Sequence, residues 1–128
     1  MEIVAFVEPV GKPRMTQRDK WAKRPAVLKY RHFCDLLRQY VKTLPPSFAV
    51  DFHISMPKSW SQKKKDAMNG TPHQQKPDVD NLQKSLFDAV CEDDSYIWNV
   101  HARKFWATTG SIFITSVDQP SPNETLRS

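Results

Sequence analysis

Carboxylate side chains are crowded into one short part of this 128-residue chain. Six of its 14 acidic residues lie between positions 78 and 94, although the whole chain has a net charge of +5. Like charges held close together cost free energy unless something compensates them. Mg²⁺ prefers oxygen ligands, needs few carboxylates and leaves positions for water and phosphate. The crowding therefore suggests a bound divalent cation. The six residues are Asp78, Asp80, Asp88, Glu92, Asp93 and Asp94.

The spacing of these residues supports a shared site. Asp78 and Asp80 are two positions apart, so in an extended segment their side chains point to the same side. Asp93 and Asp94 follow a predicted helix over residues 80–90. If that helix is short, the chain that follows it could bring one of them back to the first pair.

The predicted helix also supplies a cation. At about 100° per residue, Asn81, Lys84 and Asp88 lie on the face opposite the apolar Leu82 and Leu86. Three oxygens and a lysine that converge suit phosphodiester hydrolysis, in which a metal activates water and a lysine stabilises developing charge. Phosphodiester chemistry is therefore the first functional hypothesis.

The same residues also fit a purely structural interpretation. Asp is common at helix N-caps, so Asp78 or Asp80 could simply cap the helix. Residues 93–94 could form a turn, and Lys84 with Asp88 could be an exposed pair of little energetic weight. Spacing alone leaves the metal site and the cap-plus-turn interpretation both open.

Basic residues are concentrated in other segments. Residues 12–31 hold eight cations against Asp19 alone, with Trp21 and Tyr30 between them. Cations can follow a phosphate backbone and aromatic rings can stack on bases, although a basic surface loop has the same composition. Residues 63–65 are three lysines that fit a solvated or a phosphate-facing helix surface. The candidate DNA-binding residues are Lys12, Arg14, Arg18, Lys20, Lys23, Arg24, Lys63, Lys64, Lys65 and Lys76.

Hydrophobic periodicity predicts the elements that must position these residues. Residues 48–56 alternate between apolar and polar side chains, as in a half-buried strand. A turn at residues 108–110 predicts a hairpin between the last two strands. The predicted strands cover 2–8, 48–56, 96–106 and 111–117, and the predicted helices run from Val27 or Arg31 to Thr43, over 59–68 and over 80–90.

Length and composition exclude several classes of protein. The length corresponds to one domain, over residues 1–117, followed by a polar tail at 118–128 that is predicted to be disordered. No apolar run approaches the roughly 18 residues that span a bilayer, and the amino terminus does not resemble a signal peptide. Neither the two cysteines nor the four histidines have metal-ligand spacing. We therefore expect a reducing compartment, no disulfide and no zinc, with Cys91 as a small hydrophobe and His32, His53, His73 and His101 on the surface.

One segment resembles a known signature. The sequence KPDVDNLQKSLFDAV from Lys76, followed by EDDSYI from Glu92, resembles the PDxDNLxK…DA segment and downstream DD pair of RusA-type Holliday junction resolvases. The GKPR sequence from Gly11 is similar to the family's basic stretch after the first strand. The family is known from bacteria, phages and prophages.

The resemblance implies a fold and an activity. The fold is α+β, a single small domain with a mixed β-sheet of about four strands packed against two or three helices. The activity is Mg²⁺-dependent resolution of four-way DNA junctions by paired symmetric cuts, in recombination and repair, with Mn²⁺ as a substitute ion. Position by position, the metal ligands are Asp78, Asp80 and Asp94, with Asp93 as the alternative to Asp94, and Lys84 is catalytic. The implied partners are branched DNA and a second copy of the chain. No membrane partner is implied, and the implied location is the cytoplasm.

One departure from the family pattern keeps other functions open. Only Cys91 and Glu92 separate Val90 from Asp93, whereas many members have several more residues there. A displaced Asp94 would leave a basic DNA-binding module without catalysis, in which the aspartates are caps. A nuclease for other branched DNA is the third hypothesis.

Overall fold

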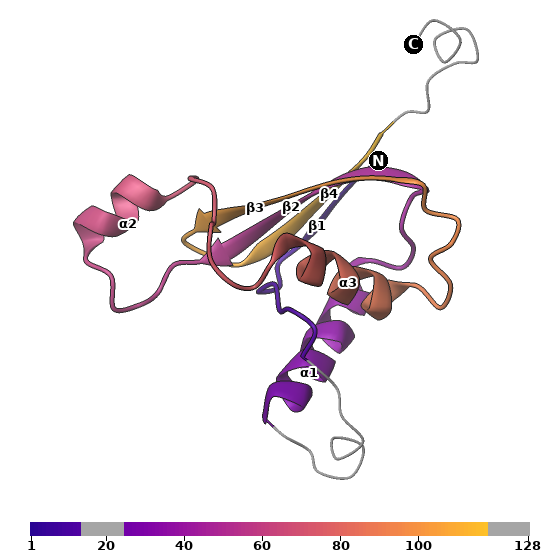
Figure 1. The fold of residues 1–128 in the computed structure, drawn as a ribbon, viewed down its shortest axis with the longest axis horizontal. Helices are drawn as coiled ribbons and strands as arrows, with labels where there is room; N and C mark the ends of the chain where they lie inside the picture. Colours follow the sequence, from indigo (N-terminus) through magenta and orange to yellow (C-terminus); the bar gives the residue numbers. More distant parts are fainter. Residues whose placement is uncertain (14–24, 118–128) are drawn as a thin grey trace, which may run out of the picture.

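A four-stranded mixed sheet carries two helices, α1 and α3, on one face (Figure 1). The structure is a computed structural model that describes residues 1–13 and 25–117. It confirms the expected α+β class. In chain order the elements are β1 (Glu2–Ala5), α1 (Pro25–Tyr40), β2 (Ser47–Ser55), α2 (Gln62–Met68), α3 (Val79–Val90), β3 (Asn99–Ala107) and β4 (Ser111–Ser116).

Some of the predicted features lie outside the described residues. These are the tail over 118–128 and five of the candidate DNA-binding residues, Arg14, Arg18, Lys20, Lys23 and Arg24. Within the described ranges, no helix combines the length and the apolar character that crossing a membrane requires.

The alternation along β2 is confirmed. Phe48, Val50 and Phe52 are completely buried, whereas Ala49 and Asp51 between them are only partly buried. These side chains pack in one hydrophobic core with Leu82 and Leu86 of α3. The face of the strand formed by every second residue therefore packs on the apolar face of the helix, whose period is 3.6 residues. This packing fixes which face of α3 turns outward.

The predicted hairpin between the last two strands is wrong. Both strands exist, but the order across the sheet is β1-β4-β2-β3, so β2 lies between them. It pairs parallel to β3 and antiparallel to β4. Residues 108–110 cross the end of β2, a gap of about 10 Å that four peptide steps can span. Strands β4 and β2 hold the two inner positions of the sheet, where Phe48, Val50 and Phe52 of β2 are fully buried.

Helix α3 is the crossover that the parallel pair β2 and β3 requires, because parallel strands cannot be joined by a tight turn. The helix begins beside the carboxyl-terminal half of the strands and runs back to their amino-terminal ends. There Trp98 N donates to Pro46 O at 2.9 Å and the Tyr96 hydroxyl donates to Leu44 O at 2.7 Å. The two ends of α3 are thus attached to opposite ends of the same strand pair.

Element boundaries differ modestly from the predictions. Strand β1 ends at Ala5 rather than Glu8, and α1 ends at Tyr40 rather than Thr43. Helix α2 is capped by Ser61, whose Oγ accepts from Lys64 N at 3.2 Å. Ser59 and Ser61 are the two serines that the sequence offers as caps, and the structure uses the second.

The prediction that His73 lies on the surface is wrong. His73 is only 3% exposed, and the centre of its ring lies 4.2 Å from the centre of the Trp106 ring, which also packs against Trp60. His73 N donates to Lys104 O at 3.0 Å, so residues 70–73 follow the free edge of β3. Burial lowers the pKa of His73 below its ordinary value, and the positive charge of Lys104 is the second cause of this lowering.

The buried His73 should make stability depend on pH. Because its folded pKa is lowered, the unfolded chain binds more protons below pH 6.5, and stability falls as the pH decreases through that value. The His73→Phe variant keeps an aromatic ring and cannot titrate. The urea midpoint of the wild type should be lower at pH 5.5 than at pH 7.5, and the midpoint of the His73→Phe variant should change clearly less. The exposed His101→Asn variant is the control. Equal pH dependence in all three proteins would contradict this assignment.

Candidate functional site

Asp78 and Asp80 lie at the start of α3 with exposed side chains. Asp78 occupies the N-cap position with an extended backbone, and its carbonyl accepts from Leu82 N at 3.1 Å. Its side chain makes no capping hydrogen bond. The carboxylate of Asp78 is therefore not used in the way that the cap interpretation requires.

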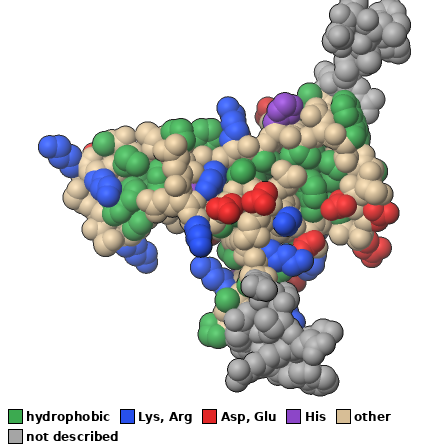
Figure 2. Space-filling view, viewed as in Figure 1, with side chains coloured by type: hydrophobic (Ala, Val, Ile, Leu, Met, Phe, Trp, Pro, Cys, Tyr) green, Lys and Arg blue, Asp and Glu red, His purple; other side chains and the backbone are tan. Residues whose placement is uncertain are grey.

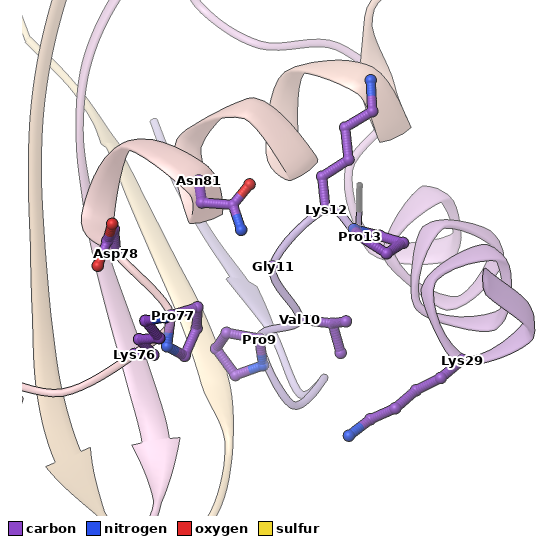
Figure 3. A pocket seen from close by; sticks show the side chains of 10 residues that line it. All are labelled: Pro9, Val10, Gly11, Lys12, Pro13, Lys29, Lys76, Pro77, Asp78 and Asn81. Atoms are coloured by element: carbon purple, nitrogen blue, oxygen red, sulfur yellow. The ribbon is translucent and has the colours of Figure 1, made fainter. Parts of the chain in front are cut away.

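A cavity of about 560 Å³ lies beside this helix start (Figure 3). Three segments that are distant in sequence form its wall: the chain after β1, α1, and the approach to α3. Lys12, Lys29 and Lys76 contribute one cation from each segment. An acidic helix start therefore faces a cavity rimmed by lysines. The lining residues are Pro9, Val10, Gly11, Lys12, Pro13, Lys29, Lys76, Pro77, Asp78 and Asn81.

Gly11 allows the chain after β1 to approach α3 this closely. A Cβ at this position would lie 2.6 Å from Nδ2 of Asn81 and 3.0 Å from Cβ of Pro77. Both distances are closer than ordinary contacts between such atoms, so with a side chain here the Asn81 amide would have to turn away and Pro77 would have to give slightly. The GKPR sequence thus packs directly on the PDxDN segment.

The polar face of α3 is oriented as predicted. Asp80, Lys84 and Asp88 are all exposed and follow one another at intervals of one helical turn. Lys84 thus lies one turn beyond Asp80 on the same outward stripe.

The Lys84–Asp88 pair considered from the sequence is replaced by another contact. Asp88 Oδ2 lies 2.5 Å from Lys12 Nζ and accepts from the Tyr30 hydroxyl at 3.3 Å. Burial raises the pKa of Tyr30, which keeps the phenol a donor. The ion pair is about 40% exposed and so adds little stability. Its effect is to hold the residues after β1 against α3.

Asp93 and Asp94 lie at the other end of α3. The helix has 12 residues, which corresponds to about 18 Å. Figure 2 shows acidic side chains over the start of α3 and, separately, over the loop that follows the helix. In residues 1–13 and 25–117, no group of three or more His, Cys, Asp or Glu is close enough to hold a metal ion. The expected return of this loop to Asp78 and Asp80 is not found within the chain, because α3 keeps the two ends apart.

The two adjacent aspartates differ in their contacts. Asp93 Oδ1 accepts from Ser95 N at 2.9 Å, and this hydrogen bond lowers the pKa of Asp93. Asp93 therefore fits the turn that the structural interpretation predicts. The Asp94 carboxylate makes no hydrogen bond or ion pair with any other described residue. Burial raises the pKa of the half-buried Cys91 thiol, which disfavours a nucleophilic thiolate.

Three lysines form an outlying basic surface on α2. Lys63 and Lys64 are exposed and Lys65 is partly buried, while α2 itself buries no residue. Lys64 Nζ lies 4.2 Å from the centre of the Trp60 ring, a cation–π contact. In Figure 1 this helix projects beyond the sheet, away from α1. The basic surface is thus separate from the lysines around the cavity.

Lys104 on β3 is a site residue that the sequence interpretation missed. Its ammonium donates to Pro77 O at 2.8 Å and to Gln75 O at 2.5 Å, directly before Asp78. The cation therefore anchors the segment that delivers Asp78 to the helix. Nothing in the alternation of residues 99–107 marks this lysine, because its partners lie 27 and 29 positions away.

Comparison with known proteins identifies a family. A family model described as "Endodeoxyribonuclease RusA" matches residues 7–115, which includes every element from α1 to β3 and nearly all of β4. No curated protein matches the chain.

Replacing Lys104 should loosen the approach to α3. Hydrogen bonds from a charged donor contribute about 1.5–3 kcal/mol each, and less where solvent reaches them. Lys104→Met should therefore lower the free energy of unfolding by roughly 1–3 kcal/mol. Lys104→Arg should lose less stability than Lys104→Met, because a guanidinium can donate to both carbonyls. Urea denaturation measures this, with exposed Lys58→Met as the control. An unchanged midpoint in Lys104→Met would show that these contacts do not hold the segment.

Proposed function

Because this chain belongs to the RusA endodeoxyribonuclease family, we propose that it resolves four-way DNA junctions by Mg²⁺-dependent, paired phosphodiester hydrolysis in recombination and repair. The observation that carries the proposal is the exposed carboxylate of Asp78, which makes no capping hydrogen bond and lies, with Asp80 close by in the sequence, at a cavity with three lysines in its wall. Carboxylates bind divalent cations and lysines bind phosphate. The site therefore offers different residues to the metal ion and to the phosphate of a phosphodiester substrate.

The donor set at the start of α3 fits a magnesium ion. Asp78 and Asp80 supply exposed carboxylate oxygens, and Mg²⁺ characteristically uses one or two carboxylates while it keeps water and phosphate as other ligands. Asp94 is proposed as a further ligand. Mn²⁺ accepts the same oxygen ligands and should substitute. When bound, such an ion would lower the pKa of water and neutralise charge on the phosphate.

The side chains of the site take distinct roles in this proposal. Lys84 stabilises the negative charge that develops on the phosphate, because this residue lies one turn from Asp80 on the same exposed stripe. Lys12, Lys29 and Lys76 hold the backbone phosphates at the cavity. The three lysines of α2 contact a more distant part of the DNA. Phosphate contacts position the substrate without reading its sequence.

A homodimer follows from the symmetry of the substrate. A four-way junction has two-fold symmetry, and its resolution needs two symmetric cuts. A dimer with one site for each cut presents both at once. We place this activity in the cytoplasm of a bacterium or of a phage-infected bacterial cell, in line with the family.

A basic DNA-binding module without catalysis is the second candidate. One observation favours it, namely that Asp78, Asp80 and Asp94 do not converge within the described part of one chain. Junction binding by such a module would fall with salt and be indifferent to Mg²⁺.

Asp80→Asn is the decisive substitution between these candidates. Loss of a metal-binding carboxylate should reduce junction cleavage by more than about 100-fold, the upper end of the loss seen for outer-shell residues. Junction affinity should be unchanged or higher, because a negative charge near the phosphate is removed. A synthetic four-way junction and a matched linear duplex, each with Mg²⁺ or EDTA, provide the assay. Glu2→Gln, on the edge strand, is the control, and full cleavage by Asp80→Asn would reject the site.

Lys84→Ala should separate rate from binding. If Lys84 acts on the charge that develops during the reaction, its removal should reduce the turnover rate by about 10²–10³-fold. Junction affinity should change by less than about tenfold, since several other cations remain. Single-turnover cleavage and a binding titration in Ca²⁺ measure the two quantities, with Lys58→Ala as the matched control. Loss of affinity with an unchanged rate would make Lys84 a phosphate-binding residue only.

A further inference from the structure

Helix α2 is an exposed arm that buries none of its own residues. It has seven residues, and an isolated helix of this length is marginal in water. Its ends supply the order, because Ser61 caps the first turn and Asn69 N donates to Lys65 O at 2.9 Å. Since the helix adds no buried side chain to the core, most of its surface is open to a partner.

The base of this arm is attached to the sheet on both sides. Trp60, just before α2, packs on Trp106 of β3 with ring centres 4.8 Å apart. After α2, Gly70 N donates to Trp106 O at 2.8 Å, and Trp106 N donates to Thr71 O at 2.9 Å. Both segments that lead to α2 are thus held at one residue of the edge strand, which fixes where the arm leaves the sheet.

The arm is basic. Residues 60–72 hold three lysines against Asp66 alone. None of these lysines forms an ion pair with another described residue. Lys63 and Lys64 are exposed, and the Lys64 ammonium is held over the Trp60 ring by the cation–π contact at 4.2 Å. The arm therefore offers two cations to an anionic partner.

The distance from α2 to the acidic start of α3 follows from the hydrogen bonds along β3. Lys104 holds the backbone just before Asp78, whereas Trp106, two residues or about 7 Å further along the strand, holds Gly70. Helix α2 ends two residues before Gly70, which adds about 7 Å, and its own length adds about 10 Å. The arm thus lies about 14–24 Å from the acidic site.

The arm and the acidic site share one face of the molecule. Figure 2 shows Lys and Arg side chains over α2 and onward toward the acidic pair at the start of α3. A B-form duplex turns once in about 34 Å and has two backbones, so each side of it presents a backbone roughly every 17 Å. This interval falls within the separation of the arm from the acidic site. A single duplex on this face can therefore contact both.

We propose that α2 binds the phosphate backbone of the same DNA arm that is cut, through Lys63 and Lys64. The inference rests on the proposed function. At about 3.4 Å for each base pair, a separation of about 14–24 Å places this contact about four to seven base pairs from the point of cleavage. The contact raises affinity without reading sequence. It also requires charged duplex over that length beside the cut.

Neutral DNA linkages test this contact without shortening the arm. The cut is first mapped on an unmodified four-way junction. Methylphosphonate linkages, which carry no charge, then replace the phosphates of both strands about four to seven base pairs from the cut, the interval that α2 should contact. A second modified junction carries them one helical turn farther away and is the DNA control.

Three proteins are titrated with each junction in Ca²⁺ over a range of salt concentrations. They are the wild type, the double variant Lys63→Gln/Lys64→Gln, and Lys42→Gln. Lys42 is exposed and lies between α1 and β2, at the end of the sheet opposite the arm, so its variant is the control for loss of charge. Thermal unfolding checks that each variant folds.

The salt dependence of binding gives the expected result. Each phosphate contact contributes about 0.9 to the slope of log affinity against log salt, so the double variant should have a slope shallower by about 1.8 on the unmodified and control junctions. With neutral linkages at α2, the wild type and the double variant should bind alike, because the partner phosphates are gone. Lys42→Gln should respond to every junction as the wild type does.

Two results would overturn the inference. One is an unchanged slope in the double variant on the unmodified junction. The other is an equal effect of the double variant on all three junctions, because the lysines would then act on other phosphates. Cleavage is read separately. If junctions are bound but not cut, the linkages are placed by counting from the branch point. The expected slopes would then retain the arm contact and reject the nuclease function.

Discussion

The need to connect two parallel strands governs the rest of this structure. Strands β2 and β3 lie side by side and point the same way, so the chain between them must travel back along the sheet. Helix α3 makes that return, with Leu82, Leu86 and Ala89 in the core. Its length then sets the distance between the residues at its start and the residues that follow its end. Asp78 and Asp80 lie at the start, and Asp93 and Asp94 follow the end.

The start of α3 is built by contacts that cross the whole sequence. Lys104 of β3 binds the carbonyls before Asp78, and Gly11 lets the chain after β1 pack against Asn81. Lys12 then reaches Asp88 further along the helix. Lys104 and Gly11 thus bring a cation and a close backbone approach to the acidic start of α3, while Lys12 holds the chain after β1 to a later turn of the helix.

Burial patterns were predictable to the extent that one face of an element is enclosed. The alternation of residues 48–56 predicts β2 because every second side chain enters the core. The apolar positions of α3 predict its outward stripe for the same reason. The hairpin and His73 were not predictable in this way. Alternation shows that a strand has two faces and does not show which strand lies beside it, and no local pattern shows that Trp106 covers a histidine ring.

The sequence by itself determined which groups are available for chemistry: the aspartates from Asp78 to Asp94, Lys84 on the outward face of a helix, and a basic segment after the first strand. Periodicity suffices for this, because it depends on residues only a few positions apart. The tertiary structure alone decided which of these groups meet. It placed Lys104 and Gly11 at Asp78 and moved Asp94 to the opposite end of α3. The path of the chain across the sheet sets these distances, and it arises from pairings between residues that are remote in sequence.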